Sequence, residues 1–378
     1  MSCARWALPS IVLALGACET LRIGLPSDGN QPDNARAQFT WQAVANGLTG
    51  PVNAFVIYRG KLLAAGGPNF LSWLDDSVSP SVWKVQSGGT TGPINDMGIL
   101  GADLIVGGVF TQAGIVGTEN IARFDGTDWH AMGDGLDAAV LTIGQFNGEL
   151  IAGGLFNASG QTPISRIARW DGQVWHAMGE GLDGPVFALA EYKGELIAGG
   201  SFSFSGSEPA RRLARWDGTA WSEFGAGADG AVHDLTVIGD VLVAGGAFTE
   251  IGATPANRVA RWNGSKWTAY GDGVGGCAGD PCTPAVLVVR SFGGKLTIGG
   301  NFTTAGGTSA NGLAFWDRGV WSPFGAGLAQ SGYLDVRALL TDDSKLVVGG
   351  RFASGGSQAS SGIKLDNVAI VASPAEVQ

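Results

Sequence analysis

Residues 167–202 read IARWDGQVWHAMGEGLDGPVFALAEYKGELIAGGSF. Apolar runs alternate with short polar turns, and an Asp-Gly pair stands between the first two runs. Asp-Gly in this position is a strong hairpin signal, because glycine takes the positive φ that the turn needs. The stretch therefore predicts two antiparallel hairpins, which pair residues 166–170 with 173–178 and residues 186–191 with 195–198.

The same unit recurs along the chain, with a central spacing of 46 residues, one shorter unit early and two longer units late. Self-similarity at a fixed period is the sequence signature of a repeat architecture. Two series each count seven units. The tryptophans stand at Trp41, Trp83, Trp129, Trp175, Trp221, Trp267 and Trp321, and Gly-Gly pairs begin at Gly66, Gly107, Gly153, Gly199, Gly245, Gly299 and Gly349.

Four antiparallel strands per unit, with seven units and no helical periodicity, predict an all-β fold, a seven-bladed β-propeller. The Gly-Gly pair is expected to end the second strand where backbones approach closely. A β-solenoid is the competing architecture, but its rungs are about half this length.

We expect residues 39–370 to form the propeller and residues 371–378 to form a short tail. The segment around Trp41 matches the fourth strand of a unit, and residues 46–52 match residues 180–186. The last unit supplies three strands that end at residues 365–366. The N-terminal segment is therefore expected to close the ring by joining the last blade, with residues 368–371 as the alternative fourth strand.

The motif order, Gly-Gly after the second strand, an Asp turn and a Trp in the fourth strand, resembles kelch and galactose-oxidase-like propellers. Gly-Gly-x-Phe followed by Ile-Ala-Arg is also similar to delta-60-type repeats of bacterial surface proteins. The usual kelch tyrosine is replaced by Trp170, Trp216, Trp262 and Trp316. Galactose oxidase needs copper and a Cys–Tyr crosslink, and no cysteine of this chain is left for one, so the resemblance implies the fold and no cofactor.

The first residues are typical of an export signal. Arg5 precedes a short apolar run, and Leu15-Gly16-Ala17-Cys18 resembles a bacterial lipobox. We expect residues 1–17 to be removed, Cys18 to carry lipid, and the polar residues 18–38 to form a flexible tether. These features predict a lipid-anchored protein of the bacterial cell envelope, with an ordinary secretory signal as the alternative.

Cys277 and Cys282 form a C-x4-C pair in a loop. Exported proteins meet an oxidising compartment, so this spacing predicts a local disulfide. A metal site is the alternative, but it needs about four ligands, and no other Cys or His lies nearby in the sequence.

The composition argues against several functions. The net charge is −10 without a basic cluster, so nucleic-acid binding is not expected. His130, His176 and His233 lie on separate units and are not expected to share a metal. Gly179-x-Gly181-x-x-Gly184 matches a dinucleotide fingerprint, but a strand follows where that motif needs a helix. No catalytic residues are predicted.

Arg123, Arg169, Arg215 and Arg261 recur on the third strand. They share a strand face with apolar residues, so we expect them to lie buried between blades and to need carboxylates. The candidate partners are Asp125, Asp171 and Asp217, or Asp137, Asp183 and Asp229. A ligand-binding ring of guanidinium groups is the alternative. The acidic turns are expected to cap the backbone, with Ca²⁺ binding as the alternative.

The strand order puts the connections from strand 2 to strand 3 and from strand 4 to the next strand 1 on one face. The long, variable loops 157–165 and 203–211 and the cysteine insertion all belong to these connections, which are therefore the expected recognition surface. We expect a monomeric binding scaffold for a protein partner or cell-envelope polymer. The alternatives are a glycan-binding module that uses Phe204 and Tyr333, and a hydrolase or lyase with carboxylates at the channel mouth.

Overall fold

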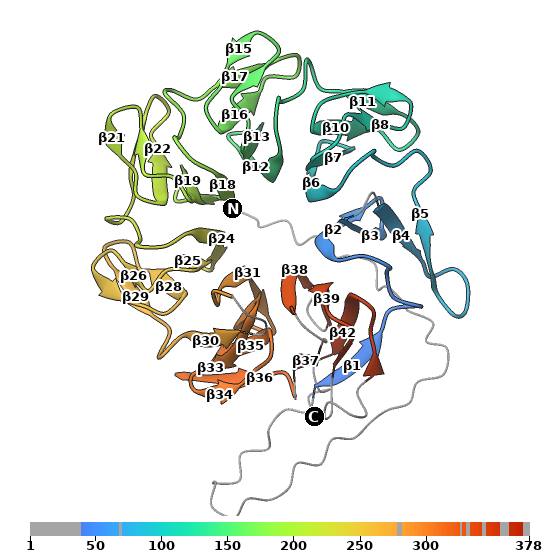
Figure 1. The fold of residues 1–378 in the computed structure, drawn as a ribbon, viewed down its shortest axis with the longest axis vertical. Coiled ribbons are helices and arrows are strands. Elements are labelled where there is room, and N and C mark those ends of the chain that lie inside the picture. Colours follow the sequence, from blue (N-terminus) through green and yellow to red (C-terminus); the bar gives the residue numbers. More distant parts are fainter. Residues whose placement is uncertain are drawn as a thin grey trace, which may run out of the picture.

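The structure is a computed structural model that describes residues 39–67, 70–277, 282–325, 327–329, 333–341, 345–355 and 363–372. The expected signal peptide, Cys18, the tether and most of the expected tail lie outside these residues. All secondary structure in the described part is β-strand. Seven four-stranded antiparallel sheets surround a central axis, as Figure 1 shows, so the predicted β-propeller is confirmed.

Each blade contributes its first strand to the inside of the ring and its fourth strand to the outside (Figure 1). We number the blades 1 to 7 by their innermost strands. These are β2 (Val52–Tyr58), β6 (Ile94–Leu100), β12 (Val140–Phe146), β18 (Val186–Tyr192), β24 (Val232–Ile238), β31 (Val286–Phe292) and β38 (Asp335–Thr341).

The remaining strands of the blades follow in the same order, from blade 1 to blade 7. The second strands are β3 (Lys61–Gly66), β7 (Asp103–Gly108), β13 (Glu149–Gly154), β19 (Glu195–Gly200), β25 (Val241–Gly246), β32 (Lys295–Gly300) and β39 (Lys345–Arg351). The third strands are β4 (Phe70–Asp75), β10 (Ile121–Phe124), β16 (Ile167–Trp170), β22 (Leu213–Trp216), β28 (Val259–Trp262), β35 (Leu313–Asp317) and β42 (Val368–Ala372). The fourth strands are β5 (Val82–Val85), β11 (Trp129–Ala131), β17 (Trp175–Ala177), β23 (Trp221–Glu223), β29 (Trp267–Ala269), β36 (Val320–Pro323) and β1 (Thr40–Ala43).

The strands around residue 180 lie within two residues of their predicted bounds. The turn between β18 and β19 has φ of 53° at Lys193 and 80° at Gly194. This is the pair of positive values that a two-residue type I′ hairpin requires. At the other predicted hairpin, the Asp171 carboxylate accepts hydrogen bonds from the backbone N–H groups of Gln173 and Val174 at 2.8 and 2.9 Å. Local turn chemistry thus fixes both hairpins of the repeat.

The Gly-Gly pairs allow the close approach of backbones that the sequence predicts. A Cβ atom on Gly199 would lie 2.8 Å from Cγ1 of Val232 in the next blade, and one on Gly200 would lie 2.1 Å from the carbonyl oxygen of Pro185. Blade 1 is an exception, because the register puts Ala65, and not Gly66, opposite Ala54 at the first position of the pair.

The tryptophans of the fourth strands join neighbouring blades. Trp175 is fully buried, and its indole N–H donates to the carbonyl oxygen of Met132 in the preceding blade at 3.1 Å. Trp221 makes the same bond to Met178 at 3.0 Å. Each of these blade interfaces therefore combines aromatic burial with a satisfied donor, which a buried indole needs.

The N-terminal strand lies on the outside of the last sheet. β1 pairs antiparallel with β42, with Trp41 opposite Val371, and β42 pairs with β39. The Trp41 segment therefore forms the fourth strand of blade 7. The expected third strand of this blade was misplaced, because it is β42 and begins at Val368. Asp366 and Asn367 form a turn before it, and the N–H groups of Leu365 and Asp366 donate to the Ala353 carbonyl.

Substitution of Trp41 tests this closure. Trp41→Ala removes a buried indole and its bond to the Phe324 carbonyl. It should lower the free energy of unfolding by about 3–5 kcal/mol, the usual cost of such a truncation. Chemical denaturation measures the loss. Trp175→Ala in blade 3 is the matched control and should cost a similar amount; a Trp41 variant as stable as wild type would contradict the pairing.

Candidate functional site

Small hairpins project from one face of the ring, in the connections between strands 2 and 3 of blades 2 to 7. They are β8 (Gln112–Ala113) with β9 (Val116–Gly117), β14 (Ala158–Ser159) with β15 (Thr162–Pro163), β20 (Phe204–Ser205) with β21 (Glu208–Pro209), β26 (Glu250–Ile251) with β27 (Thr254–Pro255), β33 (Phe302–Ala305) with β34 (Thr308–Ser309), and β40 (Ser354–Gly355) with β41 (Ile363–Lys364). Two short strands, β30 (Val274–Cys277) and β37 (Leu328–Ala329), add to the last two hairpins.

Aspartates tie these hairpins to the connections between blades. The backbone N–H of Asp183 donates to the Phe204 carbonyl at 3.0 Å, and its carboxylate accepts from the N–H groups of Ser203 and Phe204 at 2.7 and 3.0 Å. Asp137 and Asp229 make the equivalent bonds in their blades. Both kinds of connection therefore lie on one face, as the strand order predicts, and we call this the hairpin face.

These contacts assign the recurring aspartates to backbone capping. Among the described residues, no group of three or more His, Cys, Asp or Glu side chains lies close enough to hold a metal ion. Cys277 and Cys282 are joined by a disulfide with a Cα–Cα separation of 6.3 Å. This separation suits such a bond. Cys277 ends β30, so the bond anchors the insertion beside the hairpin of blade 6.

A ring of bulged residues surrounds the axis where the innermost strands begin, at the hairpin face. The pairing of strands 1 and 2 shifts by one residue after the first pair in blades 1 to 6, and after the second pair in blade 7. Such a bulge leaves one residue out of register. From blade 1 to blade 7 these residues are Asn53, Asn95, Leu141, Phe187, His233, Leu287 and Arg337. Sequence reasoning missed this ring, because strand alternation gives no sign of a bulge.

The polar side of the ring is a chain of hydrogen bonds through blades 7, 1 and 2. The Arg337 guanidinium donates to the Asn53 side chain at 2.9 Å, and the Asn53 amide donates to the Ile94 carbonyl at 2.9 Å. Asn95 donates to the Val140 carbonyl at 2.9 Å. The buried carboxylate of Asp335 holds Arg337 with bonds of 2.9 and 2.8 Å.

The opposite side of the ring is apolar. Leu141, Phe187 and Leu287 stand at the bulge positions of blades 3, 4 and 6. The ring of His233 lies 5.2 Å from that of Phe187, and burial lowers the pKa of this histidine. The lowered pKa keeps the imidazole neutral at pH 7. The mouth of the channel therefore has a polar, hydrogen-bonded half, in which Asp335 neutralises Arg337, and an aromatic, aliphatic half.

Two carboxylates follow the bulge positions and join neighbouring innermost strands. Asp96 accepts from the backbone N–H of Ile143 at 2.7 Å, and Asp234 accepts from that of Val289 at 2.7 Å and from Arg290 at 2.8 Å. Burial raises the pKa of Asp96 to about 6 and also raises that of Asp234. Their hydrogen bonds give both groups a structural role between blades.

The recurring arginines are not buried between blades, so that prediction is wrong. The side chains of Arg123, Arg169 and Arg215 are 38%, 39% and 48% exposed, and they pair with Asp103, Glu149 and Glu195 at the start of strand 2. None of the predicted aspartates is the partner. Along this side of strand 3, the positions near the hairpin face are covered by the next blade. The arginine position, nearer the opposite face, is open to solvent.

The partner pairs follow a pattern that a comparison of the repeats could have found. Blades 2, 3 and 4 place an acidic residue on strand 2 against the arginine on strand 3. Blade 1 has Lys61 and Trp73 at these positions, with Lys61 Nζ 3.6 Å from the indole centroid, and blade 6 has Lys295 and Phe315 at 5.1 Å. An ion pair is thus exchanged for a cation–π pair at the same site.

The other predicted residues are dispersed. His130 and His176 bond to Asp125 and Asp171 of their own blades at 2.8 and 2.6 Å. Phe204 is 45% exposed on blade 4, and Tyr333 is 38% exposed before blade 7, so the two aromatics form no single platform.

Comparisons with known proteins support the fold alone. No family model matches the chain, and no curated protein matches it. The WD40 β-propeller domain of Doa1 aligns with a TM-score of 0.52 and 12% identity, covering 90% of this chain and 98% of that one. The computationally designed protein Ika8 aligns at 0.50 and 14%, covering 87% and 98%. The extracellular domain of the putative one component system BT4673 from B. thetaiotaomicron aligns at 0.53 and 10%, covering 88% and 39%.

Loss of a capping carboxylate should loosen one hairpin without unfolding the ring. Asp183→Ala removes the acceptor of two backbone N–H groups, so local opening of β20 and β21 should become easier by about 1–2 kcal/mol. Hydrogen exchange of the Ser203 and Phe204 amides measures this change. Glu180→Ala in the same connection is the control, and equal protection in both variants would contradict the capping role.

The raised pKa of Asp96 gives stability a defined pH dependence. Its folded value of about 6 exceeds its ordinary value of 3.8. The folded state therefore binds more protons and loses stability as pH rises between these values. The free energy of unfolding of Asp96→Asn should rise relative to wild type from about pH 4 to about pH 6, measured by denaturation.

Asp217→Asn is the control, because backbone N–H groups of Ala220 and Thr219 lower the pKa of Asp217. Its stabilising contribution is complete above the ordinary pKa and is lost only in acid. Its difference from wild type should stay constant between about pH 5 and about pH 7. A constant difference for Asp96→Asn over the same series would show that Asp96 titrates normally.

Proposed function

We propose that this chain is a non-catalytic binding scaffold whose hairpin face engages a protein partner or a cell-envelope polymer. The observation that carries the proposal is the mouth of the channel, where Arg337 and two asparagines face an apolar half that includes Phe187. A surface with these two halves can hold a partner by hydrogen bonds on one side and by apolar burial on the other.

Preorganised loops favour the same function. Asp137, Asp183 and Asp229 tie three hairpins to the connections beside them, and a disulfide joins Cys277 to Cys282. Rigid loops lose little conformational entropy on binding, so more of the interaction energy is retained as affinity. Ile115 at the tip of the first hairpin is 96% exposed and Leu155 is 40% exposed. These side chains give the face apolar groups for a partner.

The cellular location of the protein is also part of the proposal. We infer a kelch-like propeller carried by lipid on Cys18 and held away from a bacterial membrane by residues 18–38. The described part of the chain contains no helix that is long and apolar enough to span a membrane. Loss of palmitate labelling and of membrane association in Cys18→Ala would support the anchor, and unchanged association would refute it.

Site-specific photo-crosslinking in the native cell envelope tests the binding face. A photoreactive residue in place of Ile115 or Phe204 should yield discrete adducts, because both side chains project from the hairpin face. Val174, which is 50% exposed in a turn on the opposite face, is the matched control and should yield none. Adducts from Val174 alone would place recognition on the face opposite the hairpins and would overturn the proposal.

The glycan-binding alternative has one favourable observation. Tyr333 receives a hydrogen bond from the Asn301 amide at 3.3 Å, and the guanidinium of Arg351 lies 5.5 Å from its ring. An aromatic face with polar neighbours is a usual sugar contact. Adducts that disappear after glycosidase treatment of the envelope would favour this alternative over a protein partner.

A further inference from the structure

Blade 1 departs from the other blades at one packing position. The residue three places after the fourth-strand tryptophan is apolar in six blades, and it lies in the hydrophobic clusters between blades. These residues are Val44, Met132, Met178, Phe224, Tyr270 and Phe324. Blade 1 has Gln86 there, which supplies less apolar volume to the interface with blade 2.

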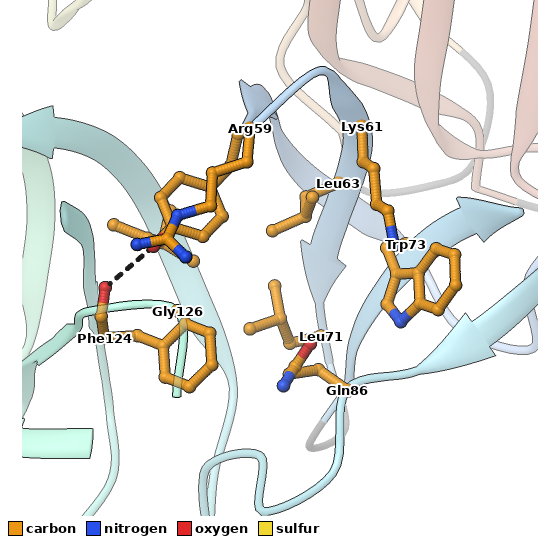
Figure 2. A pocket seen from close by; sticks show the side chains of 10 residues that line it. Arg59, Lys61, Leu63, Leu71, Trp73, Gln86, Phe124 and Gly126 are labelled. Carbon is orange, nitrogen blue, oxygen red and sulfur yellow. Dashed lines mark hydrogen bonds between the residues drawn. The ribbon is translucent and has the colours of Figure 1, made fainter. Parts of the chain in front are cut away.

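A pocket of about 150 Å³ opens at this position between blades 1 and 2. Its lining residues are Tyr58, Arg59, Lys61, Leu63, Leu71, Trp73, Gln86, Leu104, Phe124 and Gly126. Leu63, Leu71 and Phe124 lie on the apolar side of the pocket, between the two blades (Figure 2). Arg59 belongs to the turn between strands 1 and 2, and Gly126 to the turn between strands 3 and 4, so this blade 1–2 pocket lies on the face opposite the hairpins.

Two cations stand at the rim of the pocket. Figure 2 shows Arg59 and Lys61 on either side of Leu63 and Leu71. Lys61 lies over the Trp73 ring, and the Arg59 guanidinium lies 5.2 Å from the Tyr58 ring and donates to the Asp125 carbonyl. Among the described residues, neither cation forms an ion pair with a carboxylate. Both therefore retain charge that an anion can use.

The interface between blades 4 and 5 shows what closes the equivalent space. Tyr192 and Lys193 match Tyr58 and Arg59, but Phe224 fills the position of Gln86. Glu195 and Arg215 replace Lys61 and Trp73 and pair with each other at 3.5 Å. This interface is filled by an aromatic ring, and its charges at these positions neutralise each other.

We propose that the blade 1–2 pocket binds a small carboxylate that carries one aromatic ring. Cavities of about this volume accept a benzene-sized group. Tyr58, Leu63 and Phe124 each keep a small exposed area and provide the apolar contact surface. The carboxylate then lies between Arg59 and Lys61, where charge-assisted hydrogen bonds stabilise it. This site is separate from the hairpin face and does not depend on the function proposed above.

Binding of phenylacetate, measured by calorimetry and by ligand-observed NMR, tests the assignment. Wild type should bind phenylacetate more tightly than acetate, which lacks the ring, and than phenylacetamide, which lacks the charge. Arg59→Ala and Lys61→Ala should each weaken binding about tenfold, since each removes a charge-assisted contact. Lys193→Ala at the equivalent rim of blade 4 is the matched control and should leave affinity unchanged.

Gln86→Met is the decisive variant, because Met132 and Met178 occupy the same position in blades 2 and 3. It should fold, raise the melting temperature and abolish phenylacetate binding. Wild-type affinity in Gln86→Met, or equal affinity for acetate, would overturn the proposal. If Gln86→Met did not fold, the two rim variants still decide the matter, because both change side chains at the rim: undiminished binding in both would refute the site.

Discussion

The close approach of the second strand of one blade to the innermost strand of the next is the constraint on which the rest of this propeller depends. Gly199 leaves space for a valine of the next blade, and Gly200 lets strand 2 lie against the backbone that leads into strand 1. A Cβ atom on Gly199 would collide with the Val232 side chain, and one on Gly200 would collide with the Pro185 carbonyl oxygen. The glycine pair recurs in blades 2 to 7, and blade 1 has Ala65 at its first position. Neighbouring blades therefore meet with similar geometry, and the indole N–H groups of Trp175 and Trp221 bond across two of these interfaces.

A scaffold repeated this regularly leaves little room for function in the repeat itself. The recurring aspartates, arginines and histidines all serve local structure, as caps or as solvent-exposed pairs. Specificity therefore has to come from positions at which one blade differs from the others. The bulge residues around the axis, the cysteine insertion and the blade 1–2 pocket are such positions, and they lie on two opposite faces of the ring.

Much of the fold could be predicted from the sequence, since Trp175 and Gly199 mark close-packed positions that recur from blade to blade, with Ala65 in place of the glycine in blade 1. The exposure of the Arg169 side chain could not be predicted in the same way. Alternation along a strand assigns a side chain to a face, but it does not say how far along that face the next blade reaches. Ile167 lies under the neighbouring sheet, and Arg169, two residues further out, lies beyond its edge.

The candidate sites were less accessible to sequence reasoning. The bulges that leave Phe187 and Arg337 out of register give no signal in the alternation of apolar residues. When the repeats are aligned, Gln86 stands out as a polar residue at a position that is apolar in the other six. The importance of Gln86 depends on the fact that residues at this position fill the space between blades, which only the packed structure reveals.

The position of β1 has a mechanical consequence. The ring is held shut by a strand of four residues at the N-terminal end of the domain. Tension applied at that end is therefore borne first by the hydrogen bonds between β1 and β42 and by the packing of the Trp41 side chain. Such a load would act first on the pairing of β1 with β42, and it would reach blade 6 directly through the bond from the Trp41 indole to the Phe324 carbonyl.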